Sequence, residues 1–192
     1  MKVLGIYGSP RKGGNTDILL DESLRAAREA GADVSYIRCC DLKMSGCVEC
    51  GSCDETGQCV IPDDMQVVYP QLVEADAIIL ASPMFFYGIT SQAKALMDRC
   101  QALWCKRMLE KDQDRRRTYD GGRGYLICAG ATGGKQLFDG AQLVAKYFYD
   151  ALDMSYEGGV FVKKIEAKGD IRKDPDALKQ AYELGKTAAE PR

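Results

Sequence analysis

Apolar and polar positions follow two alternating periods along this 192-residue chain, and the alternation predicts strands separated by helices. The run Ala77–Ala81 is apolar at every position, which is typical of a strand buried on both faces of a sheet. The predicted strands are Lys2–Tyr7, Val34–Ile37, Ala77–Ala81, Arg123–Cys128 and Val160–Val162, the last starting as early as Met154.

Between the strands, apolar residues recur at helical spacing. Over Thr16–Ala30 they form one face, and Asp63 or Asp64 can cap a helix that passes through Leu72. The other predicted helices are Ser91–Trp104, Lys135–Leu152 and a polar helix from Asp174 with a frayed tip.

This order of elements predicts an α/β fold, a doubly wound five-stranded parallel sheet with helices on both faces. We expect a single domain over residues 1–192, with a cysteine-rich loop, residues 39–62, inserted after the second strand. In such sheets, ligands bind beyond the carboxyl ends of the strands, where the strand order reverses.

Composition narrows the possible functions. The net charge of −2 gives no reason to expect a nucleic acid or a membrane as partner, and no apolar run approaches the length of a membrane span. The first residues lack the long apolar stretch of a signal peptide, so we expect a cytoplasmic protein. The chain has no histidine, which excludes Ser-His-Asp and Cys-His mechanisms; enzymatic chemistry therefore requires a cofactor.

A glycine-rich turn lies between the first strand and the first helix. Glycines let backbone N–H groups approach an anion, and a helix N-terminus adds partial positive charge. The turn lacks the Lys-Ser/Thr of a nucleoside-triphosphate loop and the G-x-G-x-x-G of a dinucleotide site, and its alternative is an ordinary strand–helix turn. The candidate phosphate-binding residues are Ser9, Pro10, Arg11, Gly14, Asn15 and Thr16.

Four of the nine cysteines form a compact C-x2-C-x2-C-x5-C motif: Cys47, Cys50, Cys53 and Cys59. Three thiolates in close succession and a fourth after a bend suit the corners of a [4Fe–4S] cluster. Reduced thiols, a regulatory disulfide and a zinc ion are the alternatives. The remaining cysteines are predicted to be small buried hydrophobic residues: Cys39, Cys40, Cys100, Cys105 and Cys128.

The glycine-rich turn and the cysteine motif resemble those of the NAD(P)H-dependent FMN reductases and iron–sulfur flavoproteins, from residue 1 to about residue 135. Two further loops carry the same resemblance, Ser82–Gly88 after the third strand and Gly130–Gly134 after the fourth. The resemblance implies a flavodoxin-like sheet of strand order 2-1-3-4-5, bound FMN and a [4Fe–4S] cluster held by the four motif cysteines. The flavin-ring contacts expected on it are Ser82, Pro83, Met84, Phe85, Phe86, Tyr87, Gly88, Gly130, Thr132 and Gly133.

We therefore expect an FMN-dependent oxidoreductase that transfers electrons, with NAD(P)H or a ferredoxin-like protein as donor. The resemblance also implies a homodimer or homotetramer. The alternatives are an NAD(P)H-dependent FMN or quinone reductase without a cluster, and a metal- or redox-sensing binding module. A run of three arginines lies in a polar stretch that predicts a solvated loop: Arg115, Arg116 and Arg117. The alternatives are a subunit contact, or a binding site for an acidic partner or for the NADPH phosphate.

Overall fold

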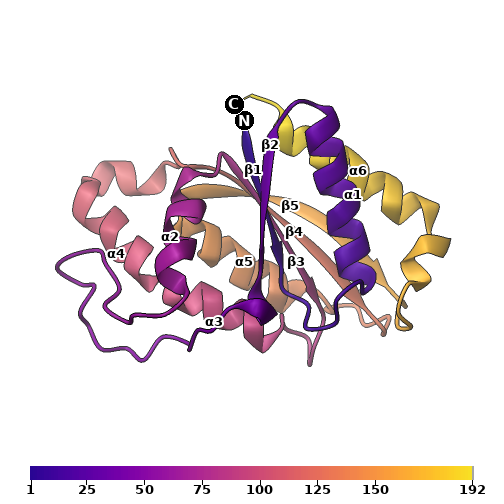
Figure 1. Cartoon of the computed structure of the whole chain (residues 1–192), viewed down its shortest axis with the longest axis horizontal. Helices are drawn as coiled ribbons and strands as arrows, with labels where there is room; N and C mark the ends of the chain where they lie inside the picture. Colours follow the sequence, from indigo (N-terminus) through magenta and orange to yellow (C-terminus); the bar gives the residue numbers. More distant parts are fainter. Residues whose placement is uncertain (192) are drawn as a thin grey trace.

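Five parallel strands form one sheet in the order β2-β1-β3-β4-β5 (Figure 1). The computed structural model describes residues 1–191. The strands are β1 (Lys2–Tyr7), β2 (Asp33–Arg38), β3 (Ala77–Pro83), β4 (Gly122–Gly130) and β5 (Met154–Lys163). The doubly wound sheet and the strand order expected from the sequence are thus confirmed.

Helices cover both faces of the sheet, as Figure 1 shows. On one face, α1 (Asn15–Glu29) and α6 (Pro175–Ala189) pack against each other and on the strands. The other face carries α2 (Met65–Glu74), α3 (Ser91–Arg99), α4 (Gln101–Glu110) and α5 (Asp139–Ala151). Each face has its own apolar cluster, which is why the strands are buried on both sides.

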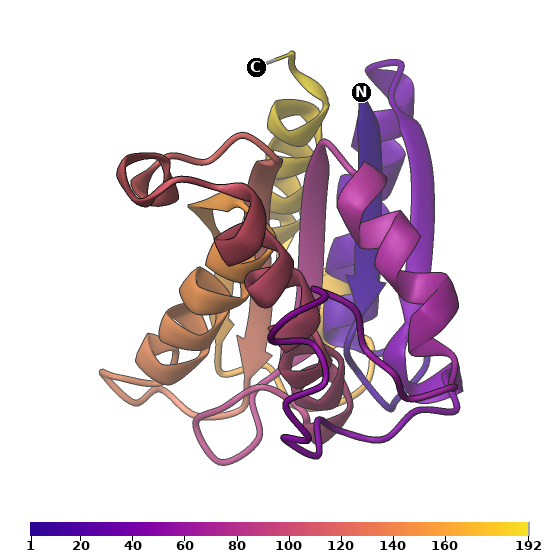
Figure 2. The same ribbon diagram turned by 90° about the vertical axis from the view of Figure 1, so that its left-hand side faces the viewer.

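The single helix predicted over Ser91–Trp104 is wrong, because the structure has two helices that meet at Cys100. The Cys100 thiol donates to the Leu96 carbonyl, and the Cys100 backbone N–H donates to Met97 instead. This shift of the Cys100 N–H from the fourth to the third preceding carbonyl marks the break between the two helices. The break gives α4 its own direction beside the cysteine loop (Figure 2).

Two other helices differ from the prediction. α5 begins at Asp139 rather than Lys135, because Leu137 and Phe138 are buried in the turn before it. The last helix was predicted to be polar, but α6 buries one face and packs closely on α1. A Cβ on Gly185 would lie 1.9 Å from the Ser23 carbonyl oxygen, so the two helices approach too closely for a larger residue.

Parallel strands bring the loops that follow them to one edge of the sheet, the lower edge in Figure 1. These loops include the glycine-rich turn after β1, the cysteine-rich segment after β2, residues 84–90, residues 131–138 and the segment after β5. No helix in the described part of the chain is long and apolar enough to cross a membrane.

Candidate functional site

The turn between β1 and α1 forms a small cradle of backbone. Gly13 has a φ of +68°, which favours glycine, and the Ser9 hydroxyl accepts from the Arg11 N–H at 3.1 Å. A Cβ on Gly14 would lie 3.7 Å from Ser9 Oγ and 3.5 Å from Arg11 Nε. The same Cβ would lie 3.0 Å from the Arg11 carbonyl oxygen, so the absence of a side chain lets the backbone turn closely beside both polar groups.

Helix α1 starts at this cradle with unpaired donors. Gly14 is its N-cap and supplies no side-chain cap. Among residues 1–191, nothing accepts a hydrogen bond from the backbone N–H groups of Asn15, Thr16 or Asp17. All three residues are buried, and their N–H groups lack a partner in the described part of the chain. This arrangement suits an anion.

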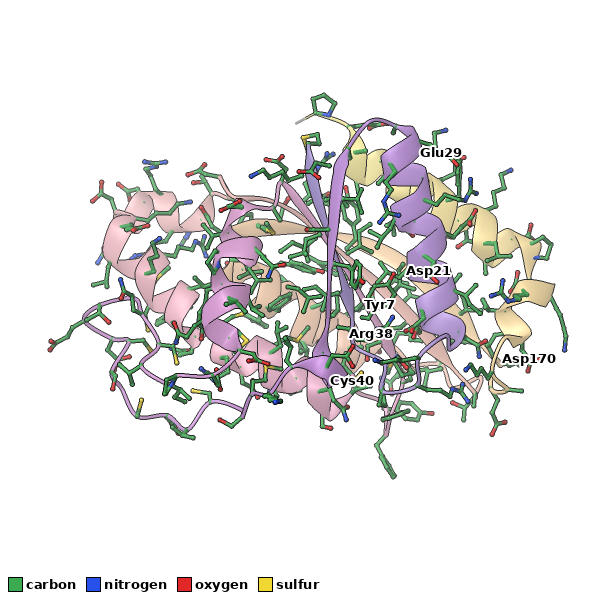
Figure 3. The ribbon with its side chains drawn as sticks, in the orientation of Figure 1. Tyr7, Asp21, Glu29, Arg38, Cys40 and Asp170 are labelled. Atoms are coloured by element: carbon green, nitrogen blue, oxygen red, sulfur yellow. The ribbon has the colours of Figure 1, made fainter. Side chains whose placement is uncertain are left out.

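The charges near the cradle are balanced by an ion pair. Asp17 is buried and its carboxylate accepts from the Arg38 guanidinium at 2.7 Å and from the Gly13 N–H at 2.9 Å. Arg38 also lies 4.1 Å above the Tyr7 ring, and the Tyr7 hydroxyl donates to Asp21 (Figure 3). Burial and the bond to Asp21 raise the pKa of Tyr7 well above its usual value.

The side chain of Asn15 joins the cradle to a segment far along the chain. Its amide donates to the Ala167 carbonyl at 2.9 Å and accepts from the N–H groups of Gly169 and Ile171. Arg11 likewise donates to the Glu166 carbonyl at 3.2 Å. The segment after β5 is thus fastened to the cradle, although the resemblance did not extend to it. A buried asparagine at the first position of α1 was the signal that could have pointed to these contacts.

Residues 85–88 form a tight two-residue turn. Phe85 and Gly88 exchange backbone hydrogen bonds, while Phe86 and Tyr87 have φ values of 50° and 61°. Positive φ at both central residues defines a type I′ turn, in which asparagine and glycine are preferred. Phe86 is fully exposed and Tyr87 is half exposed. The turn therefore holds two strained aromatic residues at the surface beside the sheet edge.

The turn rests on the loop after β4. A Cβ on Gly134 would lie 2.2 Å from the Tyr87 hydroxyl, and one on Gly130 would lie 3.3 Å from Met84 Cβ. Ser82 is buried, and its hydroxyl accepts from the Thr90 N–H and shapes the start of the turn. The two loops expected to contact a flavin ring therefore lie against each other.

Basic residues that the sequence reasoning missed surround the loop after β4. Lys163 donates to the Gly134 carbonyl at 2.7 Å, and the Lys164 N–H donates to the Thr132 carbonyl at 3.4 Å. A Cβ on Gly133 would lie 3.1 Å from Lys164 Cε. Two adjacent lysines at the end of a strand were a visible sequence signal for positive charge beside the site.

The four motif cysteines line one hollow of about 630 Å³ between the cysteine-rich segment and the junction of α3 with α4. Cys47 and Cys50 are exposed, and Cys53 and Cys59 are half-buried. In Figure 2 the segment crosses in front of these helices. The four predicted ligands therefore line one hollow, but among the described residues no three of their sulfur atoms lie within 4.8 Å of one another.

Arg99 holds this segment from α3. Its side chain has no exposed surface, and it donates to the Ser45 carbonyl, to Asp63 and to Cys59 Sγ at 3.2 Å. Burial opposes ionisation of Cys59, but hydrogen bonds from the Ile61 backbone and Arg99 outweigh it, so the pKa of Cys59 lies below its usual value. In contrast, burial and the neighbouring Cys53 raise the pKa of Cys105 to about 11.

Arg115, Arg116 and Arg117 lie in the short helix η2 (Gln113–Arg117) at the opposite, amino-terminal edge of the sheet. Arg116 donates to the Met108 and Lys111 carbonyls, and Arg115 pairs with Asp120. These contacts shape their own loop, which lies away from the cradle and the cysteine-rich segment.

A flavodoxin-like sheet whose carboxyl edge carries an anion cradle, aromatic turns and a cysteine loop defines a class of flavin-linked oxidoreductases. The sequence profile described as NADPH-dependent FMN reductase matches residues 1–163. The chain belongs to this family. The expected family resemblance is therefore confirmed.

Comparison with individual proteins agrees with this assignment. An iron–sulfur flavoprotein of Methanocaldococcus jannaschii is 36% identical and aligns with 99% of this chain and 96% of its own. The structure of an NAD(P)H:quinone oxidoreductase from Methanothermobacter marburgensis is similar in fold, with a TM-score of 0.71 at 13% identity, covering 100% of this chain and 98% of that one. The reduced flavodoxin of Megasphaera elsdenii superposes with a TM-score of 0.56 at 17% identity, over 98% and 99% of the two chains.

Proposed function

We propose that this protein is an FMN-dependent oxidoreductase whose cradle binds the FMN phosphate. The observation that carries the proposal is the set of three N–H groups at the start of α1, beside Gly14, that have no partner in the described chain and belong to buried residues. A phosphate accepts several hydrogen bonds at once and is favoured by the helix dipole. Ser9, Pro10, Arg11 and Thr16 border this position, and Asn15 supports it by holding residues 167–171 in place.

The ring of FMN is assigned to the two loops that meet through Tyr87 and Gly134. Phe85 and Gly88 use their N–H groups within the turn, and Met84 donates to the Ala129 carbonyl. Within the described chain the N–H groups of Phe86 and Tyr87 have no such acceptor, so these two are the donors proposed for the polar edge of the ring. Ser82 and Pro83 position the turn, and Gly130, Thr132 and Gly133 provide the facing backbone. Bound FMN supplies the acceptance of a hydride and the release of single electrons.

The cysteine-rich segment is proposed to hold a [4Fe–4S] cluster through Cys47, Cys50, Cys53 and Cys59. Support comes from the hollow that these four residues share and from the similarity to a protein named as an iron–sulfur flavoprotein. Arg99 would donate to the sulfur of Cys59, the kind of contact that tunes a cluster's reduction potential. NAD(P)H or a ferredoxin-like protein is the proposed donor, and a homodimer or homotetramer the proposed assembly.

A cluster-free NAD(P)H-dependent FMN or quinone reductase is the second candidate. It is favoured by Cys53, whose sulfur lies 3.8 Å from that of Cys105, a residue outside the motif. The two candidates share the flavin site and differ only in what the thiols hold.

Cofactor analysis of anaerobically purified protein tests the proposal. We expect about one FMN per chain and, for the cluster, iron and sulfide near four each. Cys50→Ala should abolish the iron and leave FMN bound, whereas Cys100→Ala, which removes a buried thiol outside the hollow, should keep both. FMN without iron in the anaerobic protein would support the cluster-free reductase, and absence of FMN would contradict both candidates.

A further inference from the structure

The segment that follows β5 brings a lysine to the anion cradle. It leads to the short helix η3 (Asp170–Lys173), which lies beside the start of α1 at the lower edge of the sheet in Figure 1. The Asn15 amide donates to the Ala167 carbonyl at 2.9 Å and accepts from the Gly169 N–H at 2.9 Å. Lys168 therefore stands between two residues that are both bonded to the first residue of α1.

The side chain of Lys168 reaches the glycines of the cradle. A Cβ on Gly13 would lie 3.6 Å from Lys168 Cε and 3.7 Å from Lys168 Nζ. Because Gly13 has no side chain and a φ of +68°, the ammonium group lies beside bare backbone. Arg11 approaches the next glycine in the same way, since its Nε would lie 3.5 Å from a Cβ on Gly14. Two cationic side chains thus approach neighbouring glycines of one turn.

The positive charge of these two side chains is not balanced by a carboxylate. Lys12 and Arg38, the other basic residues near the turn, each form an ion pair at 2.7 Å. Arg11 donates only to a backbone carbonyl, and neither it nor Lys168 pairs with an acidic side chain among residues 1–191. The cradle therefore combines two uncompensated cations with the three N–H groups at the start of α1 that lack a partner in the described chain.

We propose that Lys168 is a binding residue for the phosphate of FMN and that its charge makes the cradle select FMN over riboflavin. This inference rests on the proposed function, because it takes the cradle as the phosphate site. A phosphate monoester carries a charge of about −1.5 to −2 at pH 7, more than the single guanidinium of Arg11 neutralises. An ammonium group acts on phosphate as a point charge, so it needs no bidentate geometry. Asn15 is then the positioning residue that holds both neighbours of Lys168.

Fluorescence titration of the apo protein with FMN and with riboflavin tests this role. Lys168→Met keeps the aliphatic stem and removes the charge. We expect the ratio of FMN affinity to riboflavin affinity to fall at least about threefold, less than for a buried charge because Lys168 is exposed. Lys168→Arg keeps the charge and should keep the ratio. Between about 0.05 M and about 0.5 M NaCl, FMN affinity should fall more steeply in the wild type than in Lys168→Met, because salt screens exposed charges.

Lys173→Met is the matched control. Lys173 is exposed in the same segment, but its ammonium pairs with Asp170 at 2.8 Å, so its loss should leave the ratio unchanged. An unchanged ratio and salt dependence in Lys168→Met, or equal losses in the two variants, would overturn the role of Lys168. The phosphate assignment would still stand if the wild type preferred FMN. A wild type without that preference would contradict the phosphate assignment and the role of Lys168 together.

Discussion

The guanidinium of Arg99 donates a hydrogen bond to the sulfur of Cys59 over 3.2 Å, from a helix that lies outside the cysteine-rich segment. The same group bonds Ser45 near the start of the segment and Asp63 after its last cysteine. One buried side chain therefore joins both ends of a segment that has neither helix nor strand between residues 42 and 64.

Arg99→Met should lower the free energy of unfolding by about 3 kcal/mol, because removing one partner of a buried ion pair leaves Asp63 uncompensated. Urea denaturation measures the effect. Lys94→Ala is the control, since Lys94 forms an exposed pair with Asp98 on the same helix and should change stability by about 0.5 kcal/mol or less. Similar losses in the two variants would show that Arg99 is no more than a surface charge.

The contribution of Asp63 should depend on pH. The hydrogen bond from Arg99 and those from the Met65 and Ser45 backbone hold the pKa of Asp63 below its usual value, despite the opposing effect of burial. A carboxyl group whose pKa is lower in the folded state stabilises the protein fully at pH values above its unfolded pKa of about 3.9. This stabilisation is lost as the pH falls through the pKa of the folded state. Asp63→Asn should thus be less stable than wild type at pH 7, with the gap closing below about pH 4. Parallel urea midpoints from pH 7 to pH 3 would contradict this.

The cradle predicts a preference for FMN over riboflavin. Two charge-assisted hydrogen bonds of about 1.5 kcal/mol each correspond to a ratio of about 100 in affinity. Gly14→Ala should reduce this ratio about tenfold, because the new Cβ would lie 3.0 Å from the Arg11 carbonyl and border the phosphate position. Fluorescence titration with both flavins measures it, and Gly46→Ala is the control. If the wild-type protein binds FMN and riboflavin equally tightly, the cradle does not bind the FMN phosphate.

The strained turn at residues 85–88 predicts that a substitution which relieves the strain raises the stability of the protein but weakens flavin binding. A non-glycine residue in the left-handed region costs about 1–2 kcal/mol, and asparagine tolerates that region better than phenylalanine. Phe86→Asn should therefore raise the free energy of unfolding by about 1 kcal/mol and weaken FMN binding. Phe85→Asn relieves no such strain, because Phe85 is not among the residues of positive φ, and should give no gain. A fall in stability in Phe86→Asn would show that the ring packs in the apo protein.

Local sequence patterns were sufficient for the individual strands and the main loops, whereas the strand order was expected from the family resemblance. The apolar run Ala77–Ala81 defined a strand buried on both faces, and the glycines before Asn15 marked a turn onto a helix start. These features depend on neighbours in the chain, so periodicity and residue type determine them. The spacing of Cys47, Cys50, Cys53 and Cys59 likewise identified residues that share one hollow.

Contacts between distant segments were decided only by the tertiary structure. Asn15 bonds a segment about 150 residues away, and this contact does not follow from helical spacing. The break between α3 and α4 at Cys100 was likewise not visible in the apolar pattern. Cys105 fits the apolar pattern of a helix, and the sequence assigns it to the core. Only the packing of Gly57 on Lys106 brings Cys53 and Asp54 to its sulfur, because folding sets distances between side chains that are remote along the chain.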